Sequence, residues 1–344
     1  MKRVSIVMCT YNGEKYLAGQ LDSILSQTYP LHEILIQDDG SSDGTVQIIE
    51  DYRKRYPVIR LIRNEQNLGY NRNFLTAISK ASGDYIAVSD QDDIWDAEKI
   101  RMMMEELETS GKEVCFCRSR KFGDDPSRPA PLFDARRPNY GIERMLFGNM
   151  SPGHTLLLSR SFANKCTLDL FNQFIQTDQC YYDYFIGALA ASYDSLYLCN
   201  KVLVHYRRHS QQVTSNQDRG EINPDRALST MAKAFRLYYA RKREMIFSFS
   251  EKYRFFSSLP VRNRHMDNAL KLAQLFTRRD PLSYIRLTCL CVKLRREIFY
   301  TNEVPPLKLL FRSFLFPIYA AIYFQEVDAL PKGSGACGPH REDV

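Results

Sequence analysis

Hydrophobic and polar positions alternate in two ways along the first hundred residues. Short, nearly continuous apolar runs predict buried strands at 4–9, 34–36, 58–62 and 85–88. After each of them, apolar residues recur at helical spacing, which predicts helices at 14–27, 44–55, 70–80 and 96–107. Ser42 or Asp43 is the expected N-cap of the second helix. Apolar strands separated by helices are typical of a doubly wound α/β fold, in which helices cover both faces of a mostly parallel sheet.

Three polar stretches each follow one of these strands directly. They read CTYNGE at 9–14, QDDGSSDG at 37–44 and SDQDDIW at 89–95. In open α/β sheets, ligands bind beyond the carboxyl ends of the strands. The order of the elements therefore predicts that the three stretches meet at one rim of the sheet and form one site.

The pattern changes further along the chain. Residues 118–139 are rich in Pro, Arg and Asp and have no period, which predicts a long surface loop beside the site. Apolar segments return over 141–205, and from 225 to 324 the pattern is helical, with basic and aromatic residues interleaved. The residues from 330 onward have the composition of a disordered tail.

Charge is distributed unevenly. The chain carries a net charge of +7, but the stretch from Arg219 to Arg312 holds 20 Lys and Arg against eight Asp and Glu. This asymmetry predicts that the C-terminal part faces something anionic.

The remaining composition points to a reducing compartment. Nine cysteines without regular spacing favour free thiols, and the two C-x-C pairs lack the second pair of ligands that a zinc site needs. The apolar run after Lys2 and Arg3 is shorter than the ~7–15 residues of a signal-peptide core. No run reaches the ~18 uncharged apolar residues of a membrane span. We therefore expect a cytoplasmic protein.

The most acidic of the polar stretches places Asp90, Asp92 and Asp93 within four positions. A polar turn that caps the following helix would explain one carboxylate, but three exceed what a cap needs. Mg²⁺ and Mn²⁺ prefer one or two carboxylates together with phosphate oxygens. The cluster therefore predicts a divalent cation bound together with a diphosphate.

The second stretch, which contains Asp38 and Asp39, reads as a strand-to-helix turn. Its glycines permit a tight bend, yet the turn alone does not explain both acids. A carboxylate here can accept from a pyrimidine imide or a ribose hydroxyl, whereas it would repel a phosphate. Neither the dinucleotide-binding nor the P-loop glycine motif occurs in the sequence.

Two candidates lie downstream, and each has a structural alternative. Asp183 opens an apolar helical stretch, where it is either a helix-capping residue or a general base. The segment HYRRHSQQ at 205–212 is either a basic strand end in solvent or a site residue group. In the second case Arg207, Arg208 and His209 would bind a diphosphate, or His209 would ligate a metal.

Taken together, these stretches resemble family 2 glycosyltransferases of the GT-A fold. The resemblance is dense over 3–108, thinner over about 149–215 and absent thereafter. It includes the D-x-D metal motif in the form S-D-Q-D-D-x-W, which is similar to the branch that contains rhamnosyltransferases. HYRRHSQQ resembles the family's Y-R-x-H segment. The Q-x-x-R-W motif of processive synthases is missing, which favours transfer of a single sugar per encounter.

The resemblance implies a role for individual residues. The donor nucleotide would be bound by Thr10, Tyr11, Asn12, Glu14, Asp39, Arg72 and Asp90. Asp90 and Asp92 match the D-x-D and imply a Mn²⁺ or Mg²⁺ site, while Arg207 and His209 would contact the diphosphate. Asp183 stands at the position of the catalytic base, although Tyr182 replaces the Glu or His that usually precedes it.

The resemblance also implies how the chain is divided. Residues 1–115 would form the nucleotide-sugar-binding half of a GT-A domain, and 116–216 the half that binds the acceptor and supplies the base. A basic helical region would follow at 217–329, and a disordered tail at 330–344.

The implied activity is metal-dependent, inverting transfer of one sugar, rhamnose or another hexose, from a UDP- or dTDP-linked donor to a saccharide hydroxyl. Such a reaction would serve surface polysaccharide or O-antigen biosynthesis. Independently of the resemblance, the basic C-terminal stretch LKLLFRSFLFPIYAAIYF at 307–324, broken by Lys308, Arg312 and Pro317, suits peripheral contact with a membrane surface. If it docks at the inner face of the cell membrane, we expect a lipid-linked saccharide as the acceptor. Packing of the basic helices on the α/β core, with a solvated basic face, is the alternative.

Two other classes of function share some of these features. A nucleotidyltransferase also uses paired acids and a metal, but it usually carries a Gly-rich basic loop that CTYNGEKY does not resemble. A non-catalytic nucleotide-sugar-binding protein remains open. A nucleic-acid binder is disfavoured, because acids dominate the predicted site and would repel a phosphate backbone.

Overall fold

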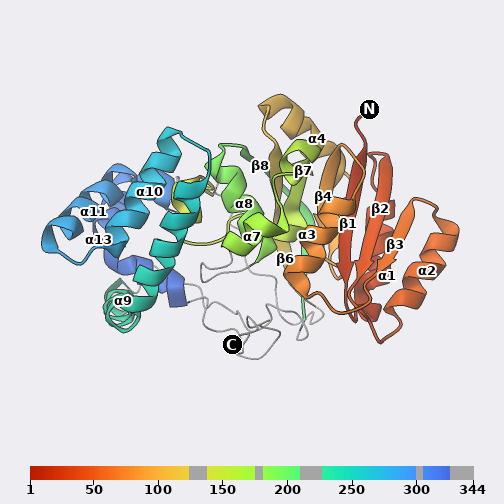
Figure 1. Cartoon of the computed structure of the whole chain (residues 1–344), viewed down its shortest axis with the longest axis horizontal. Helices are drawn as coiled ribbons and strands as arrows, with labels where there is room; N and C mark the ends of the chain where they lie inside the picture. The colour runs from red at the N-terminus through yellow and green to blue at the C-terminus, as the bar shows by residue number, and fades with distance from the viewer. Residues whose placement is uncertain (124–137, 175–180, 210–226, 300–304, 326–344) are drawn as a thin grey trace, which may run out of the picture.

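The sheet and a group of C-terminal helices lie on opposite sides of the molecule (Figure 1). This computed structural model describes residues 1–123, 138–174, 181–209, 227–299 and 305–325. The tail at 330–344, most of the loop at 118–139 and the division at 216/217 lie outside the described residues.

The strands of the described residues form one mixed sheet in the order β3-β2-β1-β4-β7-β6-β8-β5. Their bounds are β1 Val4–Thr10, β2 Leu31–Asp38, β3 Ile59–Arg63, β4 Tyr85–Ser89, β5 Ile94–Trp95, β6 Val114–Gly123, β7 Leu156–Ser159 and β8 Leu196–Arg208. Strands β3, β2, β1 and β4 pair in parallel, as do β6 and β8, whereas β7 runs antiparallel to both of its neighbours and β5 antiparallel to β8. The predicted mostly parallel α/β sheet is confirmed.

Helices of the N-terminal half follow the strands as predicted. They are α1 Glu14–Leu25, α2 Thr45–Arg55, α3 Tyr70–Lys80 and α4 Lys99–Ser110. Between α4 and the C-terminal group lie α5 Ile142–Met145, the short 3-10 helix η1 Gly153–Thr155, α6 Arg160–Ala163, α7 Leu168–Phe174 and α8 Tyr182–Ser192. The C-terminal group is α9 Ala227–Ser258, α10 Arg264–Thr277, α11 Pro281–Lys293, α12 Arg295–Ile298 and α13 Pro306–Gln325.

Two helix starts differ from the expectation. The N-cap position of α2 is Gly44, not Ser42 or Asp43, although the Asp43 carboxylate still accepts from the Thr45 N–H at 3.0 Å. Helix α4 begins at Lys99 rather than Asp96, because residues 94–95 form β5 and the Asp96 carboxylate closes a turn on the Glu98 N–H at 2.9 Å.

Side chains of β1 alternate between two buried clusters, one on each face of the sheet. Val4, Ile6 and Met8 pack with residues of α1, α2 and α4. Val7 and Cys9 belong to the other cluster, which contains residues of α3, α8 and the C-terminal helices. The alternation accounts for helices on both faces, because each face of the strand is apolar and must be covered.

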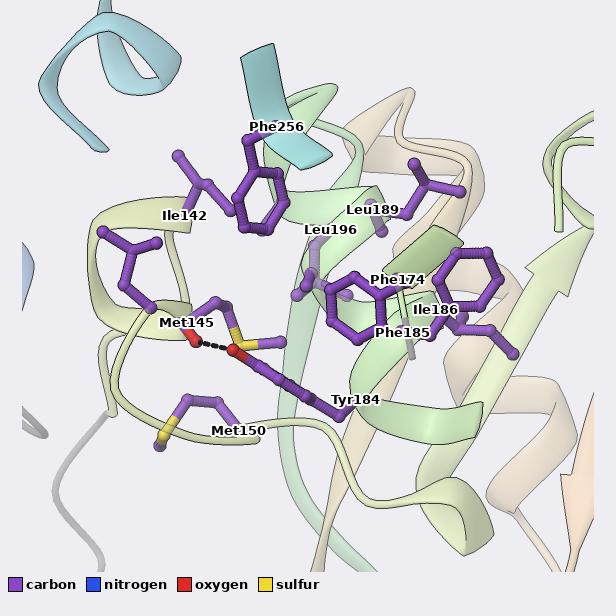
Figure 2. Packing of buried hydrophobic residues seen from close by; sticks show 14 of the residues in the cluster. Ile142, Met145, Met150, Phe174, Tyr184, Phe185, Ile186, Leu189, Leu196 and Phe256 are labelled. Atoms are coloured by element: carbon purple, nitrogen blue, oxygen red, sulfur yellow. Dashed lines mark hydrogen bonds between the residues drawn. The ribbon is translucent and has the colours of Figure 1, made fainter. Parts of the chain in front are cut away.

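The C-terminal helices are anchored to the α/β part by this second cluster (Figure 2). Phe256 of α9 lies beside Phe174 and the α8 residues, and the Tyr184 hydroxyl donates to the Met145 carbonyl at 2.6 Å. The buried Lys252 ammonium of α9 donates to the Leu146 carbonyl at 2.9 Å. These contacts join α9 to α7 and to Leu146, the residue that follows α5.

None of the helices in the described residues is long and apolar enough to cross a membrane.

Candidate functional site

The three polar stretches meet at the carboxyl ends of β1, β2 and β4, as their order predicts. The strands are neighbours in the sheet, and hydrogen bonds join the loops that follow them. The Tyr11 N–H donates to the Gln91 side chain at 3.0 Å, and the Ser42 N–H donates to the Asn12 side chain at 2.8 Å. Asn12 adopts a φ of 48°, a left-handed conformation that Asn tolerates better than most residues.

Several residues expected at the nucleoside are also the residues that build this rim. The Thr10 hydroxyl donates to Asp38 at 2.9 Å, and Glu14 accepts from the Gly44 N–H at 2.6 Å. Asp38 further accepts from the Ser41 N–H at 2.9 Å and so closes the turn between β2 and α2. Tyr11 is 52% exposed, and its ring is therefore available to a ligand.

Asp39 is buried and connects the β2 loop to the segment before α3. Its carboxylate accepts from the N–H groups of Leu68 and Gly69 at 2.7 and 3.0 Å and from the Asn64 amide at 2.8 Å. Arg72 lies exposed in the first turn of α3, just beyond this connection. Asp39, which we expect at the nucleobase, and Arg72, which we expect at the nucleotide, thus lie on the same part of the rim.

The acidic cluster has two environments. The side chains of Asp90 and Asp92 are 23% and 14% exposed, whereas that of Asp93 is fully buried. One oxygen of Asp93 accepts from the Arg207 N–H at 2.9 Å, and the other is buried without a hydrogen-bond partner in the described part of the chain. A carboxylate in this position requires a nearby positive charge.

His154 is the basic side chain that lies beside this carboxylate, and the sequence pattern did not indicate it. Its Nδ1 lies 3.4 Å from an Asp90 oxygen and 3.9 Å from an Asp93 oxygen, and its ring stacks on Tyr206 at 4.8 Å. Asp90, Asp93 and His154 offer ligand atoms within 4.8 Å of one another. This group therefore contains Asp90 but has Asp93 where the D-x-D resemblance had placed Asp92.

The direction of β7 explains how His154 reaches the acids. Because β7 runs antiparallel to β4, residues 152–155, which precede β7, lie beside the carboxyl end of β4. An apolar run such as 155–158 does not reveal its own direction in a sheet. Only the antiparallel pairing of β4 with β7 shows that His154 lies beside the acids.

Burial and mutual repulsion set the pKa values in the cluster. Burial raises the pKa of Asp93 to about 7, and the charges of Asp90 and Asp92 act in the same direction. Burial and Asp90 likewise raise the pKa of Asp92, against the effect of His209. Burial alone would lower the pKa of His154. The charges of Asp93 and Asp90 have the larger combined effect and raise this pKa above its ordinary value.

A buried lysine of α4 contacts the segment 152–155 that carries His154. The Lys99 ammonium is fully buried, donates to the His154 carbonyl at 2.7 Å and lies 3.2 Å from the centre of the Trp95 ring. Burial lowers its pKa to about 8. This contact ties α4 to the 152–155 segment.

Residues at the end of β8 contact the acidic loop that follows β4. The His209 Nε2 lies 2.7 Å from an Asp92 oxygen, and the Arg207 Nε donates to the Asp92 carbonyl at 2.9 Å. The Arg207 guanidinium lies 4.6 Å from the ring centres of both Tyr16 and Phe122. Both residues expected at the diphosphate therefore contact the acidic loop, while residues 210–212 of HYRRHSQQ lie outside the described residues.

Asp183 reaches the same region from the first turn of α8. The N-cap of this helix is Tyr181, so Asp183 does not occupy the capping position. Its two oxygens accept from the Gly153 N–H at 3.0 Å and the Tyr184 N–H at 2.7 Å. Burial raises its pKa to about 6. A carboxylate with this pKa is ionised near neutral pH and can accept a proton.

Two adjacent residues, Gly153 and His154, thus link Asp183 to the acidic cluster that follows β4. Gly153 holds Asp183, and His154 holds Asp90 and Asp93. A side chain at position 153 would overlap the Tyr182 hydroxyl, so the close approach of this segment to α8 requires glycine.

Comparison with known proteins places this arrangement in a family. The model of the family "Glycosyl transferase family 2" matches residues 5–163. The dTDP-rhamnosyl transferase RfbG of Shigella flexneri is 32% identical over 222 residues, which are 61% of this chain and 74% of RfbG. An uncharacterised protein of Mycobacterium tuberculosis, Rv1520, is 32% identical over 164 residues, 46% of this chain and 47% of that relative, so the chain spans about half of the relative's length.

The fold comparison agrees. The crystal structure of S. aureus TarS 1–349 in complex with UDP-GlcNAc matches with a TM-score of 0.56 at 15% identity, over 96% of this chain and 89% of TarS. This likeness supports the GT-A fold that the sequence resemblance implies. The identity to RfbG, over most of that relative's length, shows that the chain belongs to glycosyl transferase family 2.

Proposed function

We propose that this protein transfers one sugar, with inversion, from a nucleotide-diphosphate sugar to a hydroxyl of a saccharide acceptor. The observation that carries the proposal is the position of Asp183: a buried carboxylate with a pKa raised to about 6, joined through Gly153 and His154 to the acids beyond β4. A base and a group of acids suited to a diphosphate-bound cation are thereby held in one rigid site.

The donor side of the site is the rim formed by the β1, β2 and α3 loops. We propose that Thr10, Tyr11, Asn12, Glu14, Asp39, Arg72 and Asp90 surround the nucleotide. The exposed Tyr11 ring can stack on a base, and Asp39 is tied to the loops that would form the edge of the pocket. The similarity to RfbG favours a dTDP-linked donor with rhamnose as the sugar, and a UDP-linked hexose is the alternative.

A divalent cation, Mn²⁺ or Mg²⁺, fits the residues that line the other side. Asp90 and Asp92 are the partly exposed carboxylates, whereas Asp93 is too deeply buried to share a cation with a diphosphate. Burial and the charge of Asp90 raise the pKa of Asp92, and a cation beside both carboxylates would relieve their repulsion. We propose that Asp90 and Asp92 hold the cation, with Asp93 and His154 as their buried support. When bound, the cation would neutralise charge on the departing diphosphate.

The remaining steps belong to protein side chains. Asp183 accepts the proton of the acceptor hydroxyl as that hydroxyl forms its bond to the anomeric carbon, and the bond to the diphosphate breaks. Arg207 and His209 contact the Asp92 loop, which supports our proposal that they also contact the diphosphate. The proton ends on Asp183, and the nucleoside diphosphate leaves.

The setting follows from this chemistry. We propose a role in surface polysaccharide or O-antigen biosynthesis, at the cytoplasmic side of the cell membrane, on an acceptor that is itself a saccharide. The similarity to TuaG of Bacillus subtilis, a putative teichuronic acid biosynthesis glycosyltransferase that is 34% identical over 102 residues, supports this direction.

Product analysis distinguishes this proposal from its rivals. The purified protein would be incubated with Mn²⁺ and, in turn, dTDP-rhamnose, UDP-hexoses and GDP-mannose. A glycosyltransferase slowly releases the nucleoside diphosphate from one donor without pyrophosphate. Release of pyrophosphate would indicate a nucleotidyltransferase, and binding without turnover, even with saccharide acceptors, would indicate a non-catalytic binding protein.

A further inference from the structure

Helix α13 exposes an apolar stripe on the side that faces away from the protein. Leu307, Leu310, Phe311 and Phe314 are 83%, 44%, 64% and 60% exposed. Their spacing places them on one side of the helix, because residues three, four and seven apart share a face. The opposite side is buried through Leu309, Ser313, Phe316 and Ala320. The stripe is thus a second apolar face on a helix whose first face is already packed.

Helix α11, which packs against α13, has a similar face. Leu282 and Ile285 are 56% and 58% exposed, and Cys289 lies exposed one turn further on the same side. The buried residues of this helix, Ser283, Leu287 and Cys291, lie on its other side. Both helices therefore carry apolar residues that the described part of the protein leaves in solvent.

The charge of the same two helices has one sign. The sequences of α11 and α13 contain no Asp or Glu, and they carry Arg286, Lys293, Lys308 and Arg312. Across residues 227–299 and 305–325 there are 18 Lys and Arg against five Asp and Glu. By helical spacing, Arg286 and Lys293 lie on the side of α11 that carries Leu282 and Ile285. On α13, Lys308 lies at the edge of the stripe, whereas Arg312 lies toward the packed side. Apolar side chains flanked by basic residues in this way fit a surface that is apolar within and anionic at its boundary.

We propose that the outward faces of α11 and α13 dock on the surface of an anionic phospholipid bilayer. Their aliphatic and aromatic side chains enter the boundary between headgroups and acyl chains, and Arg286, Lys293 and Lys308 contact the phosphates. The helices lie on the membrane without spanning it, since Lys308, Arg312 and Pro317 interrupt the apolar run of α13. A second copy of the chain fits this face less well, because a symmetric interface would bring basic residues against basic residues.

The inference stands apart from the proposed reaction, because it rests on helices far along the chain from the acidic cluster. Docking would bring a site that accepts saccharides close to acceptors anchored in the bilayer.

Vesicle flotation tests the inference with the full-length protein. We expect it to float with vesicles of 50% phosphatidylglycerol and 50% phosphatidylcholine at low salt. We expect at least tenfold less bound protein on pure phosphatidylcholine, or at 0.5 M NaCl. The variant Leu310→Glu/Phe314→Glu should lose at least tenfold of the binding to anionic vesicles. The matched control Tyr56→Glu/Leu168→Glu makes the same charge change at two exposed positions of the α/β part and should bind as the wild type does.

Three results would overturn the inference: no flotation of the wild type, equal flotation of the α13 variant and the wild type, or equal binding to both lipid compositions. A wild-type dimer in solution that the α13 variant converts to monomer would assign the face to a second copy instead. Thermal unfolding and NDP release from the donor, measured without vesicles, confirm that the variants are folded and that their loss concerns lipid alone.

Discussion

The imidazole Nε2 of His209 lies 2.7 Å from an Asp92 oxygen, which joins the end of β8 to the loop beyond β4. Both side chains are mostly buried, at 13% and 14% exposure. The contact fixes the orientation of the carboxylate that we propose as a cation ligand. A side chain that orients a ligand in this way typically changes metal affinity when it is removed.

The variant His209→Ala should therefore weaken Mn²⁺ binding by about 10–100-fold. Titration calorimetry with Mn²⁺ in the presence of the nucleoside diphosphate would measure it. His32→Ala is the matched control, because His32 is exposed at the start of β2, at the opposite end of the strands. Unchanged Mn²⁺ affinity in His209→Ala would show that this histidine does not support the cation site.

Chelation provides a direct test of metal dependence. Transfer should stop in excess EDTA and return when Mn²⁺ or Mg²⁺ is added above the chelator concentration, because in the proposed reaction a cation neutralises charge on the departing diphosphate. Circular dichroism before and after chelation would show whether the fold is retained. Full transfer activity in EDTA would remove the metal from the proposed reaction.

Gly153→Ala should destabilise the protein and lower its activity, because the new methyl group would overlap Tyr182. We expect a loss of ~1–3 kcal/mol in the free energy of unfolding, as is usual for overpacking. Removing the hydroxyl in Gly153→Ala/Tyr182→Phe should recover part of this loss. Denaturant unfolding would measure both, with Gly19→Ala as control, since a methyl group there meets only Ile94 at an ordinary 3.5 Å. An additive double variant would show that the overlap has no effect.

The pH dependence of transfer follows from Asp183. Its pKa is raised to about 6, so the base is charged above that pH and protonated below it. At saturating Mn²⁺, kcat/KM should be level from pH 7 to 8 and fall about tenfold per unit below pH 6. Donor binding measured at each pH would separate this loss from titration of the acidic cluster. A profile that stays level to pH 4.5 would argue against Asp183 as the base.

The sequence was sufficient to predict most of the N-terminal half. Strands β1 and β4 are nearly continuous apolar runs because helices cover both of their faces, and a strand of this kind is easily recognised. Their order alone placed the three polar loops at one rim, where hydrogen bonds such as that from Tyr11 to Gln91 now join them.

What the sequence could not predict depends on contacts between distant segments. His154 reaches Asp90 only because β7 runs antiparallel to β4, and a short apolar run carries no record of its direction. The different environments of Asp92 and Asp93 depend on which way adjacent side chains turn after β4 ends. One faces His209 and the other the buried side of His154, a difference that only the packed structure reveals.

The variant Asp183→Asn tests whether Asp183 is the base of a sugar transfer. The measurement is transfer from the identified donor, together with calorimetric donor binding, in this variant and in Asp169→Asn, which changes an exposed acid of α7. If Asp183 is the base, Asp183→Asn loses ~10²–10⁴-fold in kcat and binds the donor as the wild type does, while Asp169→Asn keeps both properties. Near-normal turnover in folded Asp183→Asn would contradict this role.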